Sequence, residues 1–194
     1  MKRVCVFCGS SRGGREEYSA AARTFGAALA RRGLGVVTGA GHIGLMGVLA
    51  DAALEAGGEV IGVIPRALVD RELAHRGLTA LHVVETMHQR KALMADLSDG
   101  FAALPGGFGT ADELFEILTW AQLGIHARPV GLLNVAGFFD PLLAWLDRAV
   151  EERFLREQHR RLLLVEADPE RLLERLLTEP PSAQTEKWID ESDR

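Results

Sequence analysis

Three short glycine-containing segments each follow an apolar run, and their residue types could bind an anion. They are Gly9-Ser10-Ser11, residues 39–44 and residues 105–110. Glycine lets backbone N–H groups come close to a ligand, and a helix that starts there adds the positive end of its dipole. Three such turns at one edge of a fold predict a site for a phosphate group.

Residues 105–113 read Pro-Gly-Gly-Phe-Gly-Thr-Ala-Asp-Glu and carry the most specific of these patterns. No Gly-Lys-Ser/Thr follows, so this is not a Walker A phosphate loop. Thr110 could cap the next helix or donate to a phosphate. A carboxylate beside a phosphate is electrostatically unfavourable, which favours a catalytic task for Glu113. A capping box between Thr110 and Glu113 explains the same pair equally well.

Residues 39–44 read Gly-Ala-Gly-His-Ile-Gly and match the G-x-G-x-x-G pattern. A dinucleotide site would need an acidic residue after the next strand, which instead ends Val63-Ile64-Pro65-Arg66. The glycines could also serve only the packing of a helix against a strand. We favour a contact with a mononucleotide, with Gly41 as a candidate contact.

The elements that must position these turns alternate between short apolar strands and helices. We expect strands over 2–8, 34–38, 60–64, 81–84, 101–104, 129–133 and 162–165. We expect helices over 17–32, 44–56, 87–96, 111–123, 138–153 and 169–177, with a loop over 66–81 that can hold a helical turn. This order predicts an α/β fold, a Rossmann-like doubly wound parallel sheet with helices on both faces. Residues 1–178 would form a single catalytic domain, and 179–194 a mobile tail.

Net charge and composition limit the kinds of ligand or macromolecule that this chain can bind. The 194 residues carry a formal net charge of −5, which argues against a nucleic-acid groove or an anionic membrane surface. No apolar stretch reaches the ~18 residues of a membrane span, and the N-terminus lacks a secretory signal. The histidines show no metal-ligand spacing, so we expect neither a metal nor another cofactor. We expect a cytoplasmic protein.

Cys5 and Cys8 form a C-x-x-C pattern inside the first expected strand. A redox site of the thioredoxin type would place this pattern at the start of a helix. Residues three apart on a strand point to opposite faces, so we interpret the pair as two buried thiols in a reducing compartment.

Several blocks in order resemble the Lonely Guy (LOG) family of phosphoribohydrolases. Its motif PGGxGTxxE is matched by Pro105, Gly106, Gly107, Gly109, Thr110 and Glu113. Residues 87–91, 119–126, 5–11, 43–47, 60–65 and 131–134 look like the family as well. The resemblance covers roughly residues 1–178 and departs at residues 39–42, where relatives usually read Gly-Gly-Gly-Ser. The methyl of Ala40 and the imidazole of His42 are expected near the ligand, where they would change substrate preference.

The resemblance implies a Rossmann-like fold and hydrolysis of an N6-modified AMP to the free base and ribose 5-phosphate. It implies that Arg90 and Glu113 are the catalytic pair and that the protein is a homodimer or higher homo-oligomer. An apolar cluster on residues 114–120 suits a subunit partner or a fully buried helix. The substrate contacts expected from the resemblance and the glycine turns are Gly9, Ser10, Gly41, Glu72, Met87, Lys91, Gly106, Gly107, Phe108, Gly109 and Thr110.

Three other functions fit parts of the sequence. A general AMP nucleosidase would use the same residues. A non-catalytic nucleotide or cofactor carrier would keep the glycine turns but need neither Arg90 nor Glu113. A pyridoxal phosphate decarboxylase, the name often given to relatives, needs a lysine for its Schiff base, and only Lys91 is a candidate away from the chain ends.

Overall fold

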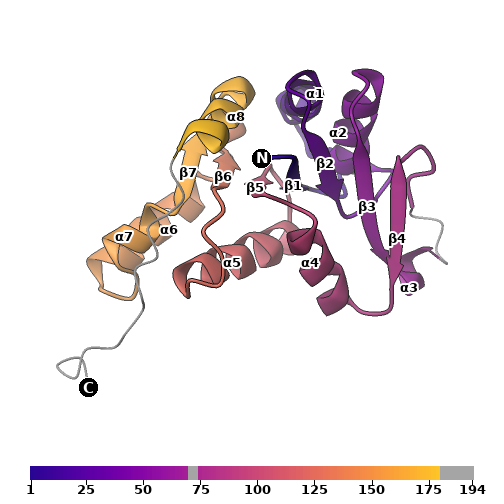
Figure 1. The fold of residues 1–194 in the computed structure, drawn as a ribbon. Helices are drawn as coiled ribbons and strands as arrows, with labels where there is room; N and C mark the ends of the chain where they lie inside the picture. Colours follow the sequence, from indigo (N-terminus) through magenta and orange to yellow (C-terminus); the bar gives the residue numbers. More distant parts are fainter. Residues whose placement is uncertain (70–73, 180–194) are drawn as a thin grey trace.

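The computed structural model describes residues 1–69 and 74–179. Its centre is a seven-stranded parallel sheet in the order β4-β3-β2-β1-β5-β6-β7 (Figure 1). The strands are β1 (Arg3–Phe7), β2 (Gly35–Thr38), β3 (Val60–Pro65), β4 (Ala80–Val84), β5 (Gly100–Ala103), β6 (Val130–Leu133) and β7 (Leu163–Glu166). They are short and almost entirely apolar because helices cover both faces of the sheet.

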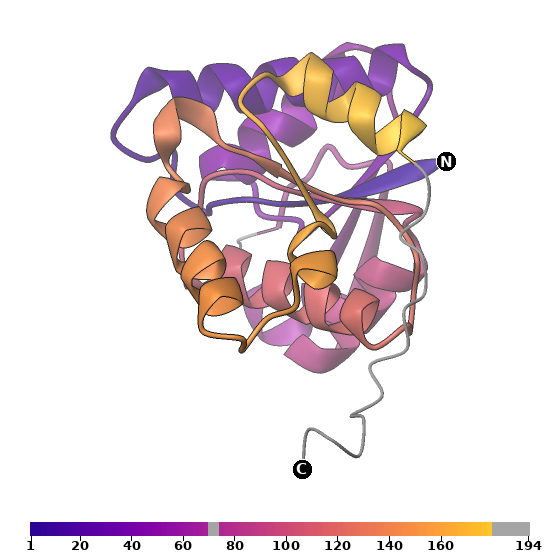
Figure 2. The same ribbon diagram turned by 90° about the vertical axis from the view of Figure 1, so that its left-hand side faces the viewer.

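Two layers of helices enclose the sheet (Figure 2). One face is covered by α1 (Glu16–Arg31), α2 (Gly44–Glu55) and α8 (Pro169–Thr178), which share a hydrophobic core with alternate strand residues such as Val4 and Val6. The other face is covered by α4 (Met87–Asp96), α5 (Phe108–Gln122) and α6 (Asp140–Glu151). Two single-turn helices, α3 (Arg66–Val69) and α7 (Glu157–Arg160), and the short η1 (Val135–Gly137) complete the described elements.

The expected fold class, a single-domain Rossmann-like α/β sheet, is confirmed. Every expected strand and every long expected helix is present, with bounds that differ by a few residues. The clearest error is the start of α5, expected at Ala111 and found at Phe108. The glycines made residues 108–110 look like loop, whereas they form the first turn of the helix. The short α7 was not expected. The expected tail mostly falls outside the described residues.

The two cysteines lie on opposite faces of the sheet, as expected. Cys5 packs into the core under α4 and α5, while Cys8, one residue past the end of β1, packs into the core under α1 and α2. Both are buried free thiols. Burial raises the pKa of each thiol, and the negative charge of Glu113 raises it further.

The burial of Cys5 and Cys8 predicts that their thiols react slowly. We expect neither thiol to react with a disulfide reagent at about pH 8 in the native protein, because a raised pKa leaves little thiolate. Both should react at once in denaturant. Rapid modification of either thiol in the folded protein, followed by absorbance, would contradict the burial described here.

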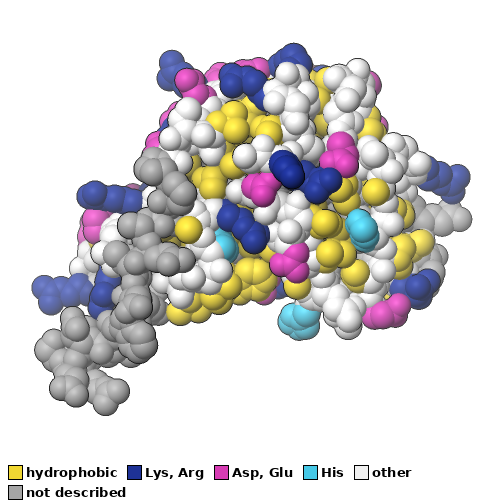
Figure 3. All heavy atoms as spheres, viewed as in Figure 1, with side chains coloured by type: hydrophobic (Ala, Val, Ile, Leu, Met, Phe, Trp, Pro, Cys, Tyr) yellow, Lys and Arg dark blue, Asp and Glu magenta, His cyan; other side chains and the backbone are white. Residues whose placement is uncertain are grey.

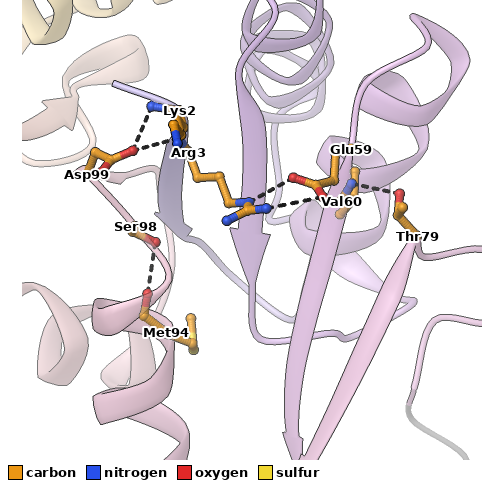
Figure 4. Close-up of polar contacts among 8 residues, drawn as sticks. All are labelled: Lys2, Arg3, Glu59, Val60, Thr79, Met94, Ser98 and Asp99. Atoms are coloured by element: carbon orange, nitrogen blue, oxygen red, sulfur yellow. Dashed lines mark hydrogen bonds and ion pairs between the residues drawn. The ribbon is translucent and has the colours of Figure 1, made fainter.

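Hydrogen bonds and an ion pair hold the first residues of β1 at the amino-terminal edge of the sheet (Figure 4). Asp99 Oδ2 accepts hydrogen bonds from the backbone N–H of Lys2 at 2.6 Å and of Arg3 at 3.0 Å. The side chain of Arg3 pairs with Glu59 at 2.7 Å. These contacts fix β1 between β2 and β5, and the opposite, carboxyl-terminal edge is left for a ligand.

The order in which the strands are added reverses at β1. Strands β2 to β4 lie on one side of it, and β5 to β7 lie on the other. The register pairs Val4 with Gly100 and Phe7 with Ala103, so β1 and β5 end together. Their loops diverge beyond this point, and open α/β sheets bind ligands in such crevices. Within the described residues, no helix is long and apolar enough to span a membrane.

Candidate active site

A cavity of about 400 Å³ opens at the carboxyl ends of β1, β2, β3 and β5. This volume lies within the range that holds small-molecule ligands in proteins, roughly 300–1,000 Å³. All three glycine turns contribute to its wall. Of the expected site residues, those lining the cavity are Gly9, Ser10, Gly41, Arg90, Gly107, Phe108, Gly109, Thr110 and Glu113.

The turns after β1 and β5 are joined directly, since the backbone N–H of Gly9 donates to the carbonyl of Pro105 at 3.0 Å. Gly106 lies beneath Thr110, whose Oγ1 occupies the space that a Cβ on Gly106 would need. Gly107 is the residue that caps α5, without a side-chain hydrogen bond. Thr110 is therefore the third residue of the helix, which excludes the alternative of a capping box between Thr110 and Glu113.

The start of α5 has the features of an anion site. The first N–H groups of a helix have no partner inside it, and here they belong to Phe108, Gly109 and Thr110. The start of α2 is different, because the N–H of Leu45 donates to the carbonyl of Gly9 at 3.0 Å. Of these two helix starts at the switch point, α5 is thus the one whose donors face the cavity.

Some glycines of segment 39–44 line the cavity, and another serves the packing of a helix against a neighbouring turn. Gly39 and Gly41 line the cavity. Gly44 instead serves packing, because its φ is +70° and a Cβ there would overlap the backbone of Ser10. Ala40 is fully buried with its methyl toward Gly62, and neither Ala40 nor His42 lines the cavity. The Ala40 methyl, expected near the ligand, is thus not part of the cavity wall.

Arg90 and Glu113 form a buried ion pair at the floor of the cavity. Arg90 Nη1 lies 3.0 Å from Glu113 Oε1, and the two residues are 8% and 7% exposed. Arg90 Nε also donates to the carbonyl of Val63 in β3 at 3.2 Å. The guanidinium lies so close to Gly39 that any side chain there would overlap Nη2. Three elements and the turn at Gly39 thus place one arginine against one carboxylate.

The surroundings of Glu113 shift the pKa of its carboxyl group. Burial raises the pKa of the carboxyl group above the usual value of a glutamate, and the positive charge of Arg90 offsets only part of this effect. A carboxylate with a raised pKa in a cavity is a common feature of catalytic groups. The Glu113 carboxylate can supply negative charge next to a cation that develops in a bound ligand, while Arg90 holds it in place.

The start of α4 is set by a capping box that the sequence analysis missed. The Thr86 side chain accepts from the N–H of Gln89 at 3.1 Å, and the Gln89 side chain accepts from the N–H of Thr86 at 3.2 Å. The pattern Thr-x-x-Gln before a helix is a signal that the sequence does carry. The capping box fixes the first turn of α4, and Arg90 and Lys91 follow directly after it.

The remaining expected site residues lie elsewhere. Met87 is half exposed at the start of α4, Gly106 lies behind the cavity wall, and Lys91 pairs with α5. Glu72 is outside the described residues. The sequence patterns did not indicate the apolar part of the wall, nor the contributions of Cys8 and Gly39. The missed residues are Cys8, Gly39, Ile43, Met46, Ile64 and Leu68.

The fold and this site define a class of Rossmann-like proteins with a helix start at the wall of a cavity and a buried Arg–Glu pair. A family model described as "Possible lysine decarboxylase" matches residues 46–176. The chain is 49% identical to the cytokinin riboside 5′-monophosphate phosphoribohydrolase LOG of Oryza sativa subsp. japonica, over 84% of this chain and 68% of that protein. It is 49% identical to LOG5 of Arabidopsis thaliana, which carries the same description, over 91% of this chain and 77% of that protein.

The chain belongs to the LOG family. Among solved structures, the molybdenum cofactor carrier protein of Chlamydomonas reinhardtii aligns with a TM-score of 0.69 at 23% identity, over 92% of this chain and 99% of that one. The molybdenum cofactor binding protein of Rippkaea orientalis aligns with a TM-score of 0.71 at 20% identity, over 92% and 97%. At these identities the alignments show a shared fold.

The description "lysine decarboxylase" finds no support in the lysines of the described residues. Lys91 does not line the cavity, and its ammonium group lies between two carboxylates. A Schiff-base lysine must reach the carbonyl carbon of its cofactor or substrate as a free amine. Lys2 lies at the opposite edge of the sheet, beside Asp99 (Figure 4).

Proposed function

We propose that this chain hydrolyses the N-glycosidic bond of a cytokinin riboside 5′-monophosphate, an N6-modified AMP. Water adds across the bond between the base and ribose C1′, so that the base gains the proton and ribose 5-phosphate gains the hydroxyl group. The carrying observation is the buried Glu113 carboxylate on α5, the helix whose first turn lines the same cavity. The 48–49% identity to proteins of that description supports the same reaction.

In this proposal the phosphate binds the N–H groups at the start of α5. Glu113 lies five residues beyond Phe108, roughly 7.5 Å down the helix axis at ~1.5 Å per residue. A ribose anchored through its phosphate therefore reaches the carboxylate. Binding energy from the phosphate, remote from the reacting bond, then orients the sugar.

Bond cleavage gives the ribose ring the character of an oxocarbenium ion. The Glu113 carboxylate stabilises this positive charge or orients the attacking water. Arg90 keeps Glu113 ionised in a buried site and fixes the direction of its oxygens. Charge stabilisation by a group already in position costs no reorganisation during the reaction.

The apolar part of the cavity supports an N6-modified base. Ile43, Met46, Ile64 and Leu68 line it and come from three different elements and a turn. An isopentenyl group is apolar and suits such a wall, whereas plain AMP leaves it in contact with water. A general AMP nucleosidase is the second candidate because the phosphate and ribose contacts would be the same.

One assay separates these candidates. Purified protein is incubated with isopentenyl-AMP and with AMP, and the free base is measured by chromatography. We expect release from both, with a higher kcat/KM for isopentenyl-AMP, since each buried CH₂ adds ~0.8 kcal/mol. Equal values would favour the general nucleosidase. Binding of both nucleotides without any release of base would favour a carrier.

The raised pKa of Glu113 predicts the pH dependence of turnover. Activity requires the carboxylate, so kcat/KM should fall on the acid side as Glu113 takes up a proton. Because burial raises the pKa, this fall should begin at higher pH than the value of about 4.3 for an exposed glutamate would give. A pH–rate profile that stays flat down to pH values near 4.3 would remove Glu113 ionisation from the mechanism.

We further propose that the protein is a homodimer. Phe108 lines the cavity yet is 97% exposed, and Leu123 and Ile125 after α5 are also exposed. Figure 3 shows hydrophobic side chains gathered on the surface over α5. A second copy would remove this apolar surface from water. Light scattering should then give about twice the chain mass of 21.1 kDa; a mass of one chain at micromolar concentration would reject the dimer.

A cytoplasmic location is also part of the proposal. Two buried free thiols, Cys5 and Cys8, suit a compartment in which thiols stay reduced. Cell fractionation with an antibody to the native chain would test it, and recovery in an oxidising compartment would contradict it.

A further inference from the structure

The segment that leads into β4 pairs with the turn that follows β2. Ala74 forms an isolated antiparallel bridge with Gly41, and the backbone N–H of His75 donates to the carbonyl of Ala40 at 2.8 Å. Gly41 lines the cavity of the candidate active site. The backbone of residues 74 and 75 therefore supports one wall of that cavity.

The imidazole ring of His75 connects this support to α2. His75 Nδ1 accepts a hydrogen bond from the backbone N–H of Gly77 at 3.0 Å, and Nε2 lies 2.9 Å from Asp51 Oδ1 on α2. Because Nδ1 is an acceptor, the ring carries its proton on Nε2, which donates to the Asp51 carboxylate. The side chain of His75 is only 11% exposed. One largely buried side chain thus joins residues 74–77 to the helix that follows the turn.

The other end of the same segment is held independently of His75. The backbone N–H of Val60 donates to Thr79 Oγ1 at 3.0 Å (Figure 4), and the N–H of Thr79 donates to the carbonyl of Val60 at 2.9 Å. A change at His75 should therefore leave β4 paired with β3 and act locally on residues 74–77.

Ala40, at the centre of the supported turn, has an unfavourable backbone conformation. Its φ is +65°, in the left-handed region that residues other than glycine rarely adopt. Such a conformation persists only where the surrounding structure holds it. Here the carbonyl of Ala40 accepts from His75, and its methyl is fully buried toward Gly62. These contacts oppose the tendency of Ala40 to return to a negative φ.

Both neighbours of Ala40 take part in the site. Gly39 and Gly41 line the cavity. The backbone at Gly39 lies so close to the Arg90 guanidinium that a Cβ there would overlap Nη2. A rotation at Ala40 to a negative φ would change the direction of the chain between its two neighbours. The turn therefore forms this wall only while Ala40 keeps its positive φ.

We propose that His75 is a positioning residue that holds Ala40 in its left-handed conformation and so keeps Gly39 and Gly41 in place in the cavity wall. His75 itself does not line the cavity, and it acts through the backbone of the turn. This inference rests on the proposed function for its choice of nucleotide and its kinetic readout, and one of its tests needs no ligand.

Nucleotide affinity should depend on this support. Without the His75 ring the turn can relax to negative φ, which a residue other than glycine prefers by roughly tenfold. Apparent affinity falls with the fraction of protein that is competent to bind, so His75→Ala should weaken the Kd for AMP, measured by calorimetry, by about tenfold. The KM for isopentenyl-AMP should rise similarly while kcat stays within about threefold, because bound nucleotide selects the competent turn.

The substitution Ala40→Gly should rescue the loss of His75. Glycine populates positive and negative φ about equally, so it removes the tendency of the turn to relax. In the Ala40→Gly background, His75→Ala should therefore weaken the Kd for AMP by no more than about threefold. An equal weakening in both backgrounds would overturn the proposal and make His75 a nucleotide contact. An unchanged Kd in folded His75→Ala would limit His75 to a role in stability and also overturn it.

Three further variants test the partner of the ring. Asp51→Ala removes the acceptor for His75 Nε2–H and should weaken the Kd for AMP, whereas Asp51→Asn keeps an acceptor oxygen and should bind like the wild type. The matched control is His82→Ala, which removes an exposed imidazole from β4 and should leave the Kd unchanged. An unchanged Kd in folded Asp51→Ala would contradict the proposed connection to α2.

The position of the turn can also be followed without a ligand. In proton–nitrogen correlation spectra, His75→Ala should move the amide resonances of Gly39 and Gly41, and it should move them less in the Ala40→Gly background. Resonances that stay in place in His75→Ala would overturn the proposal. If the wild-type protein releases no base, the proposed function fails, whereas the role of His75 is still judged by the Kd for AMP and by these resonances.

Discussion

Glu113→Gln should release base from isopentenyl-AMP at least about 100-fold more slowly than the wild type, which is the loss typical of removing one positioned charged or donor group. Glutamine has nearly the same shape and can still accept a hydrogen bond from Arg90, so the cavity is preserved. It carries no negative charge to stabilise a ribosyl cation. The loss should therefore appear in kcat, with the KM for the nucleotide nearly unchanged.

The matched control is Glu55→Gln on α2. Glu55 is mostly exposed, at 71%, and pairs with Arg23 only at 3.7 Å. Its variant loses the same charge but should keep the wild-type rate and melting temperature. Turnover of Glu113→Gln within about threefold of the wild type would remove Glu113 from the chemical step, since that ratio is less than 1 kcal/mol of barrier.

Arg90→Ala should lower turnover by a similar factor, ~100-fold, and should also change the stability of the protein. Removing one partner of a buried ion pair leaves the other charge without compensation, at a cost of about 3–5 kcal/mol. Glu113 then has a still higher pKa, since the positive charge of Arg90 lowers it in the wild type. The acid limb of any residual activity should move to higher pH.

The sign of the stability change with pH follows from the same raised pKa. A glutamate whose pKa is higher in the folded state binds its proton more tightly when folded. The stability of Arg90→Ala should therefore be closest to wild type at low pH and should fall as the pH rises through the pKa of Glu113. Chemical unfolding at several pH values measures this trend.

The control for this variant is Arg31→Ala on α1, which removes an exposed pair with Glu170. An exposed ion pair contributes little, about 0–1 kcal/mol, so its stability loss should be small and independent of the pH range in which Glu113 titrates. An equal loss of stability at all pH values in Arg90→Ala would show that Glu113 is not the charge left without a partner.

Local patterns in the sequence determined most of the secondary structure. The strand and helix periods predicted the elements because each layer must turn an apolar face to the sheet or to the helices. The bounds of α4 were predicted to the residue. The placement of Cys5 and Cys8 on opposite faces followed from strand geometry alone. The motif at residues 105–113 indicated a phosphate turn and a carboxylate without any tertiary information.

Other features were decided by contacts between segments distant in the sequence. The pairing of β1 with β5, whose partner residues are 96 apart in the sequence, places two of the glycine turns together. The start of α5 at Phe108 depends on Gly107, Pro105 and Gly9 meeting across that crevice. The apolar wall of the cavity comes from α2, α3 and β3, whose residues look like ordinary core positions in the sequence.

The ion pairs between α4 and α5 separate most clearly what the sequence determined from what the tertiary structure decided. The family resemblance named Arg90 and Glu113 as a catalytic pair and Lys91 as a nucleotide contact, but the sequence did not predict the partners of Lys91, because α4 and α5 are separate elements. Only the packing of both helices on one face of the sheet puts Arg90 against Glu113 and Lys91 between Asp112 and Glu116. Residue type fixed which groups can carry charge, and the tertiary structure fixed how deeply each is buried and which opposite charge compensates it.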